Sequence, residues 1–323
     1  MLRAAKFALG LLLSSAVTAQ AQTWPARPIR LIVPNASGSA TDIMARLLAN
    51  DVSKALGQNI YVENVAGPSG LTGHQAAARA EPDGYTLLFT NTSGLAGNPV
   101  SFKTLPYDPA KDFTPVAMVC NLGPQMVSAY VDAPFKSMTE FVAFAKANPG
   151  KLSYAVDATI GGAVFAGRLM TRRAALDIPE VPYRSAAQMV PDVAAGRVPV
   201  MISSIAVAKP FVDLGQVRQL AVTSARRFPS LPDVPTINEV IPGVIIDGWF
   251  VVVVAPKGVP DAIVRRLNKE IGVFLEGAEI RKRLLDIGLA TEGAGTPEST
   301  GAFIAQQQER YRVFARELNI EPQ

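Results

Sequence analysis

A repeated unit of strand, small-residue loop and helix constrains this chain more than any other feature of its sequence. The apolar run Ile29–Val33 is typical of a short buried strand, and Pro34 ends it because proline cannot extend a central strand. Apolar residues then recur with the 3.6-residue period of a helix, at Ile43, Met44, Leu47, Leu48 and Val52. Ser39 and Asp42 have the spacing of a capping box, so we expect this helix to begin near Ala40.

The same unit occurs twice more, with predicted strands at 60–62 and 85–90 that each end in small polar residues. The loop of the second unit contains Gly67, Gly70 and Gly73. Glycines at this density let backbone amides approach a ligand and form an anion-binding nest, although a plain flexible turn is the alternative. Their spacing fits neither a dinucleotide-binding fingerprint nor a Walker A loop. Ligands of open α/β sheets bind at the carboxyl ends of strands, where all three loops are expected.

Strands and helices continue to alternate along the rest of the chain. Extended runs at 113–120 and 125–131 are followed by alternating helices and strands, typical of a second α/β lobe with strand-end loops of its own. A long apolar run, 245–255, could pass between lobes, and helices are predicted after it. About 300 residues exceed the usual size of one hydrophobic core. We therefore predict an α/β protein of two lobes joined by two crossover strands.

The N-terminus has the pattern of an export signal. Arg3 and Lys6 form a basic region, Phe7–Val17 an apolar one, and Ala19–Ala21 an A-x-A cleavage site. The apolar run is shorter than the roughly 20 residues of a membrane span. We expect cleavage after Ala21 and release of the mature chain into the periplasm, without direct insertion into a membrane.

Composition narrows the chemistry. Cys120 is the only cysteine and His74 the only histidine, so neither an intrachain disulfide nor a histidine-rich metal site is possible, and no cofactor is indicated. The formal net charge is +4, which does not indicate nucleic-acid binding but suits an anionic ligand.

Several short motifs follow one another in order along nearly the whole mature chain. They are Trp24–Pro34, Asp42–Arg46, Val62–Gly70, Pro82–Leu88, Val181–Arg184, Leu231–Thr236 and Ala255–Pro260. The ordered set resembles the Bug family, the extracytoplasmic solute receptors of tripartite tricarboxylate transporters.

The resemblance implies a type II periplasmic-binding-protein fold that closes on an organic carboxylate. It implies a first lobe of residues 22–122 and 247–323 and a second lobe of residues 123–246. In the first lobe, the implied ligand-binding residues are Pro34, Asn35, Ala36, Ser37, Gly38, Ser39, Gly67, Pro68, Ser69, Gly70, Leu71, Thr72, Gly73, Thr92 and Ser93. In the second lobe, they are Asp157, Ala158, Thr159, Ile160, Gly161, Gly162, Ser203 and Ser204.

The chain departs from the family pattern at three places. The first loop reads Asn35–Ser39 where the family usually has Phe-Pro-Pro-Gly-Gly, and the loop 157–164 lacks the usual histidine. The strand 199–204 lacks the aspartate that many members carry, which removes an obvious acceptor for a ligand amine. These changes favour a dicarboxylate or an aromatic carboxylate without an amino group.

Individual side chains near the predicted loops allow two interpretations each. Asp42 fits the first turn of a helix, where a carboxylate favours the dipole, better than it fits a ligand contact. His74 could donate to a carboxylate or simply pack. Arg168 and Arg184 could bind a distal carboxylate bidentately or remain solvated. The pair Trp249–Phe250 is expected to pack at the hinge.

The sequence favours reversible carboxylate capture and delivery to membrane transporter subunits, without catalysis. A sensor that presents the same closed lobes to a receptor kinase is an alternative that sequence does not separate from transport. An exported hydrolase is the other alternative, and it is disfavoured because the chain has one imidazole and no G-x-S-x-G elbow.

Overall fold

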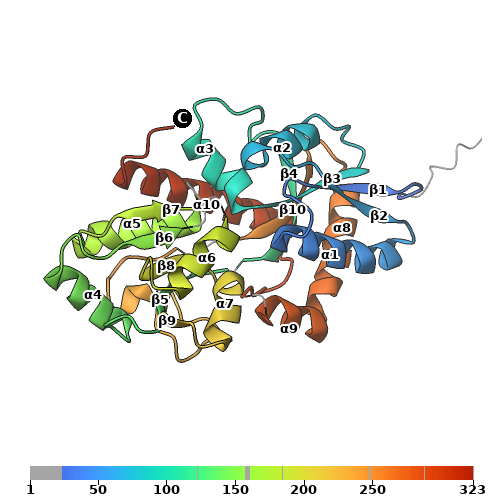
Figure 1. Cartoon of the computed structure of the whole chain (residues 1–323). Helices are drawn as coiled ribbons and strands as arrows, with labels where there is room; N and C mark the ends of the chain where they lie inside the picture. The colour runs from blue at the N-terminus through green and yellow to red at the C-terminus, as the bar shows by residue number, and fades with distance from the viewer. Residues whose placement is uncertain are drawn as a thin grey trace, which may run out of the picture.

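The computed structural model describes residues 24–121, 123–156, 161–183, 185–246, 249–286 and 288–322. Over these residues the chain forms two five-stranded sheets with helices around them, arranged as two halves side by side (Figure 1). This confirms the predicted α/β architecture of two lobes. The predicted signal peptide, 1–21, and the loop residues 157–160 lie outside the described residues.

The first sheet has the strand order β2-β1-β3-β10-β4. Its strands are β2 (Ile60–Asn64), β1 (Ile29–Val33), β3 (Thr86–Asn91), β10 (Val251–Pro256) and β4 (Phe113–Cys120). β1 pairs in parallel with β2 and β3, whereas β10 runs antiparallel between β3 and β4.

The second sheet has the order β7-β6-β8-β5-β9. Its strands are β7 (Glu180–Pro182), β6 (Tyr154–Val156), β8 (Val200–Ser204), β5 (Gln125–Tyr130) and β9 (Val217–Val222). β6 pairs in parallel with β7 and β8, and β5 is antiparallel to β8 and β9. The two sheets therefore share one plan, in which an antiparallel strand is inserted next to the end of a parallel set.

Helices connect the strands and follow them. They are α1 (Ala40–Leu56), α2 (Leu71–Ala78), α3 (Asn98–Ser101), α4 (Met138–Ala147), α5 (Gly162–Ala174), α6 (Ala186–Ala194), α7 (Ile205–Asp213), α8 (Asp261–Glu276), α9 (Ala278–Asp286) and α10 (Pro297–Glu317). The sequence did not predict α3 or α7, and Pro210 inside α7 explains the second omission because proline is unfavourable in a helix interior. None of the described helices combines the length and apolarity needed to cross a membrane.

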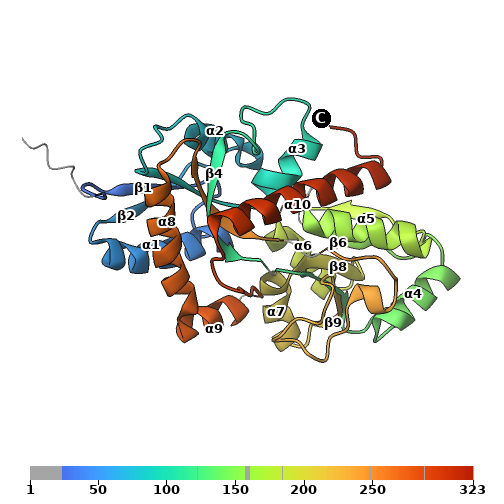
Figure 2. The same cartoon turned by 180° about the vertical axis from the view of Figure 1, so that it is seen from behind.

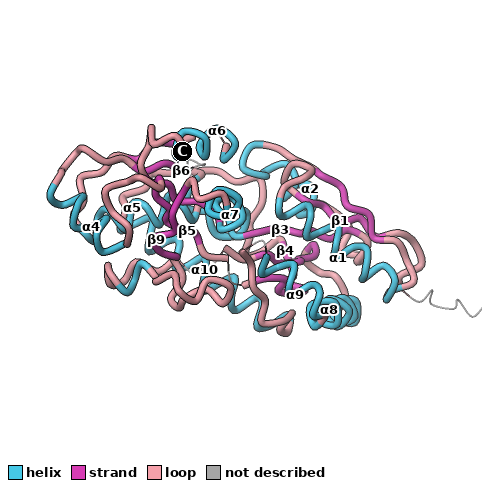
Figure 3. The backbone as a smooth tube through the Cα atoms, turned by 60° about the horizontal axis from the view of Figure 1, so that its bottom comes forward, coloured by secondary structure: helices cyan, strands magenta, loops and turns pink. Residues whose placement is uncertain are grey.

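Each sheet is packed on both faces, with strands inside and helices outside (Figure 3). Side chains of β1 alternate between two cores: Leu31 and Val33 pack with α1 and α8, and Ile32 packs on the opposite face with Ala77 of α2. This alternation follows from the two-residue period of a strand. It explains why the run is apolar throughout, since both faces are buried.

The two sheets are joined where their strand ends lie. β4 ends at Cys120, opposite Val251, and Val251 also lies opposite Asn91 at the end of β3. β5 begins at Gln125, opposite Ser204 at the end of β8. Because only residues 121–124 separate β4 from β5, the strand-end edge of one sheet lies next to the strand-end edge of the other.

Helix α10 extends beyond the first lobe and packs against the second (Figure 2). In its first half, Gln308 donates a hydrogen bond to the carbonyl of Leu95 at 3.0 Å. In its second half, the rings of Tyr311 and Phe314 pack against Phe165 of α5, with centroid distances of 5.0 and 6.1 Å. The helix therefore bridges the two lobes on the side away from the short crossovers.

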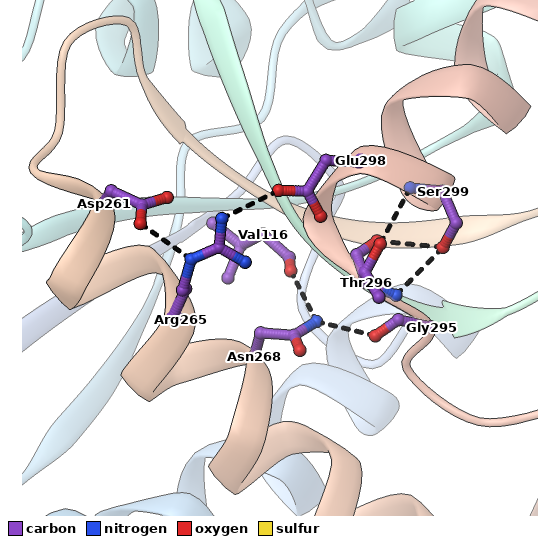
Figure 4. A network of polar contacts seen from close by, with 8 residues as sticks. All are labelled: Val116, Asp261, Arg265, Asn268, Gly295, Thr296, Glu298 and Ser299. Atoms are coloured by element: carbon purple, nitrogen blue, oxygen red, sulfur yellow. Dashed lines mark hydrogen bonds and ion pairs between the residues drawn. The ribbon is translucent and has the colours of Figure 1, made fainter.

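A polar network ties the start of α10 to the first lobe (Figure 4). The side-chain amide of Asn268 donates to the carbonyls of Val116 and Gly295, at 2.9 and 3.0 Å. Thr296 and Ser299 cap the helix by exchanging hydrogen bonds between side chain and backbone. These contacts fix α8, β4 and α10 as one unit.

Candidate functional site

The strand-end loops of the first lobe are packed against one another. A Cβ atom added to Gly73 would lie 2.8 Å from the Cβ of Pro34, so the second loop can approach the first this closely only with glycine at that position. Gly70, with a φ of 71°, lies against the carbonyl of the same proline. Asn98, which follows the third loop, donates to the carbonyl of Ser69 at 3.0 Å. The structure thus brings all three predicted loops together.

A buried carboxylate holds the first loop. Asp42 is 2% exposed, and it accepts hydrogen bonds from the backbone N–H of Gly38 at 2.8 Å, from Arg46 at 3.0 Å and from Asn64 at 2.9 Å. Burial acts to raise the pKa of Asp42, but these hydrogen bonds outweigh it and lower the pKa to about 2. Asp42 therefore has the structural role that its position in the first turn predicts, and it uses one of the amides of the loop.

His74 holds the second loop from beneath. Its Nδ1 lies 2.8 Å from the carbonyl of Gly70, and its Nε2 lies 2.7 Å from the hydroxyl of Thr90 on β3. Since a carbonyl only accepts, Nδ1 carries the proton and Nε2 accepts from the hydroxyl. The ring stacks on Tyr107 at a centroid distance of 4.8 Å. Burial lowers the pKa of His74 to about 4, so this side chain is neutral and packed, not aimed at a ligand.

The third loop is anchored to the crossover strand. The backbone N–H of Thr92 donates to the carbonyl of Phe250 at 3.1 Å, and its hydroxyl accepts from the N–H of Phe250 at 2.7 Å. Thr92 is buried, whereas Ser93 is exposed. Of this predicted pair, Ser93 is the residue whose side chain reaches the surface.

In the second lobe, the two predicted serines have partners within the chain. The hydroxyl of Ser203 donates to the carbonyl of Ser204 at 3.3 Å, and the hydroxyl of Ser204 caps α7 by accepting from the N–H of Val207 at 3.4 Å. Gly161 precedes α5 with a φ of 139°, a conformation that favours glycine. Asp157, Ala158, Thr159 and Ile160 lie outside the described residues.

Arg168 is bound by neighbours in its own lobe. Its guanidinium forms two hydrogen bonds with the carboxylate of Glu180, at 2.8 and 3.1 Å, and Tyr154 donates to the same carboxylate at 2.9 Å. The hydrogen bonds to Glu180 raise the pKa of Arg168 further. The second predicted cation, Arg184, lies outside the described residues.

Comparison with known proteins assigns the family. Residues 44–320 match the family described as the tripartite tricarboxylate transporter family receptor. The chain belongs to this receptor family. This agrees with the Bug resemblance of the sequence motifs and with the two-lobed fold.

Solved structures of similar proteins support the same assignment. The receptor is similar to the R. palustris protein Rpa4515, solved with adipate: the identity is 34%, the TM-score 0.82, and the coverage 93% of this chain and 100% of that one. It is also similar to the periplasmic binding protein BugD, at 28% identity, TM-score 0.76 and coverage of 93% and 100%. MatC from Rhodopseudomonas palustris, solved with bound malate, matches at 29% identity, TM-score 0.73 and coverage of 90% and 99%. The two-lobed periplasmic-binding-protein fold predicted from sequence is thereby confirmed.

Three side-chain amides of this receptor were not singled out by sequence reasoning. Asn64 and Asn98 cross-link the first-lobe loops, and Gln125 lies at the strand-end edge of the second sheet. All three stand at or just beyond a strand end. A polar side chain at such a position was the available signal, and only Asn64 fell within a recognised motif.

Proposed function

We propose that this receptor captures a small organic carboxylate between its two lobes and delivers it, chemically unchanged, to a tripartite tricarboxylate-type membrane transporter. The observation that carries the proposal is the placement of the strand-end loops of both sheets at adjoining edges, where helix N-termini and backbone amides offer hydrogen-bond donors to an anion. The similar proteins solved with adipate and with malate support a carboxylate as the ligand.

In this proposal the first lobe comprises residues 22–122 and 247–323, and the second comprises residues 123–246. Loops 34–39, 67–73 and 92–93 bind one carboxylate, and residues 157–161 and 203–204 contact the distal part of the ligand. Closure bends the two crossovers. A Cβ atom on Gly123 would lie only 3.1 Å from the carbonyl of Trp249, so the crossovers lie side by side and can act as one hinge.

We further propose that the receptor is exported and cleaved after Ala21, and that it works in the periplasm with membrane subunits of the transporter. The N-terminal sequence of the protein recovered from a periplasmic extract tests this. A mature chain that begins at Gln22 is expected, and recovery of the uncleaved chain from the cytoplasm alone would contradict it.

The state of His74 argues against a hydrolase in the same cleft. A nucleophilic triad needs a base with a nitrogen free to accept a proton from the nucleophile. Here Nδ1 donates to Gly70 and Nε2 accepts from Thr90, and the ring is 2% exposed. The only imidazole of the chain is thus fully occupied in holding a loop.

Two measurements test the proposed function. Native mass spectrometry of gently purified protein is expected to show a co-purified small acid, which mild denaturation releases with unchanged mass. Thermal shift across a panel of mono-, di- and aromatic carboxylates is expected to identify at least one stabilising acid. A panel without any shift, together with ligand-free mass spectra, would refute carboxylate capture, and a released product of altered mass would indicate catalysis.

A further inference from the structure

A single side-chain amide of the second lobe lies at the edge where its parallel strands end. β5 is antiparallel to β8, and Gln125, the first residue of β5, lies opposite Ser204, the last residue of β8. β6 runs parallel to β8, so its carboxyl end, which leads toward α5, lies at the same edge. Gln125 therefore stands among the strand ends of the second lobe, next to the crossover from the first.

The backbone of Gln125 is fixed, whereas its side chain is unpartnered. Its N–H donates to the hydroxyl of Thr223 at 2.9 Å, and its carbonyl accepts from the N–H of Thr223 at 2.9 Å. The residue is 9% exposed. Within the part of the chain that the structure describes, its side-chain amide has no hydrogen-bond partner, and it is not among the fully enclosed unpaired atoms. Buried polar groups are nearly always paired, so a partner from outside the chain is expected.

The side chain of Gln125 lies along the first turn of α5. A Cβ atom added to Gly162, the first residue of this 13-residue helix, would lie 3.5 Å from both Cγ and Nε2 of Gln125. No side chain caps this helix. A Cβ atom added to Gly161, just before it, would meet no atom within 4 Å, so open space lies in front of the helix end.

The donors at this point select for negative charge. The first backbone N–H groups of an uncapped helix carry partial positive charge and attract anions. The amide of Gln125 adds two N–H donors beside them. Arg168, the described cation of α5 nearest to this turn in sequence, is bound by Glu180. The second lobe thus offers neutral donors, which suit a carboxylate oxygen pair and disfavour an ammonium group.

We propose that Gln125 and the N-terminus of α5 bind the second carboxylate of a dicarboxylate whose first carboxylate is held by the first lobe. This inference rests on the proposed function, and it names the substrate class and a specificity-determining residue. The amide and the helix N–H groups donate to the two oxygens of that carboxylate. A monocarboxylate of equal length leaves these donors unpaired and binds more weakly.

Calorimetric titration with two matched series of acids tests the inference. The probes are the straight-chain α,ω-dicarboxylates from malonate to suberate and the monocarboxylates of the same carbon number. The unaltered protein should bind its best dicarboxylate at least tenfold more tightly than the matched monocarboxylate. Gln125→Glu, which adds a negative charge at the same place and volume, should reduce the dicarboxylate affinity at least tenfold and leave the monocarboxylate affinity within about threefold.

Two further variants keep the test independent of folding defects. Gln125→Met removes the donors without adding charge, and it should reduce the preference for the dicarboxylate to a few-fold. Gln216→Glu makes the same charge change at an exposed residue of the same lobe, next to β9 at the opposite edge of the sheet, and it should change neither affinity. The melting temperature of each variant without ligand reports its folding.

The outcomes separate the two levels of the proposal. Equal binding of dicarboxylates and monocarboxylates by the unaltered protein would overturn the inference and leave carboxylate capture standing. Undiminished dicarboxylate binding by Gln125→Glu, or an equal loss of both acids, would overturn it as well. Failure of the unaltered protein to bind any acid of either series would remove both the inference and the function on which it rests.

Discussion

Acid should weaken the fold through the single histidine, and the size of the effect follows from its burial. The folded protein holds the pKa of His74 at about 4, whereas an unfolded chain has a histidine pKa of about 6.5. The pKa is lowered on folding, so protons favour the unfolded state between these two values. Stability contributed by the neutral ring is complete above pH 6.5 and falls as the pH drops toward 4. The difference corresponds to about 3 kcal/mol of unfolding free energy.

The assay is urea unfolding of the unaltered protein and of His74→Asn at several pH values from 7 to 4. The variant lacks the titrating ring, so its stability should fall by about 3 kcal/mol less over this interval, although packing against Tyr107 is lost and its stability at pH 7 is lower. Because the chain has one histidine, the titration of its ring in NMR spectra reports this pKa without ambiguity. A midpoint above about 6, or an equal acid-induced loss in the variant, would refute the reasoning.

Three further predictions concern the loops and the joint of α8 with α10. Asp42→Asn should lower the unfolding free energy by about 2 kcal/mol at pH 7, and in urea titrations this difference should vanish as the pH falls from 4 to 2, because the lowered pKa stabilises the fold only while the carboxylate is charged. Gly73→Ala should displace Pro34 and weaken carboxylate binding by calorimetry, whereas Gly272→Ala, whose added methyl has room, should not; equal binding by both would contradict the loop packing. Asn268→Ala should cost about 1–3 kcal/mol in chemical denaturation because two carbonyls lose their donor, and an unchanged midpoint would contradict this.

Local patterns were enough to predict most of the strands and helices. The strand at Ile29–Val33 and the cap at Ser39 are both present, and the hydroxyl of Ser39 accepts from the N–H of Asp42 at 3.2 Å. Both signals depend only on neighbouring residues. The long run 245–255 was less informative, since its regular strand begins only at Val251; apolar composition indicates burial but does not say where pairing with another strand begins.

The candidate site could be located from sequence, but the use of its donors could not. Strand ends place the loops by a general rule of α/β sheets. Whether an amide in such a loop remains available depends on residues far away in sequence. Asn64 meets Asp42 across 22 positions, and Asn98 meets Ser69 across 29. Such pairs arise from tertiary packing, which periodicity does not encode.

The two lobes differ in how far they are organised without a ligand. In the first lobe, Asp42 already binds the N–H of Gly38, and the neutral ring of His74 fixes the carbonyl of Gly70. The second lobe keeps the unpartnered amide of Gln125 beside an uncapped helix. A ligand favours the closed state only by the contacts that it gains on closing. An acid held by the first lobe alone therefore cannot drive closure, and on the present proposal discrimination between acids arises where the second lobe completes the binding of the ligand.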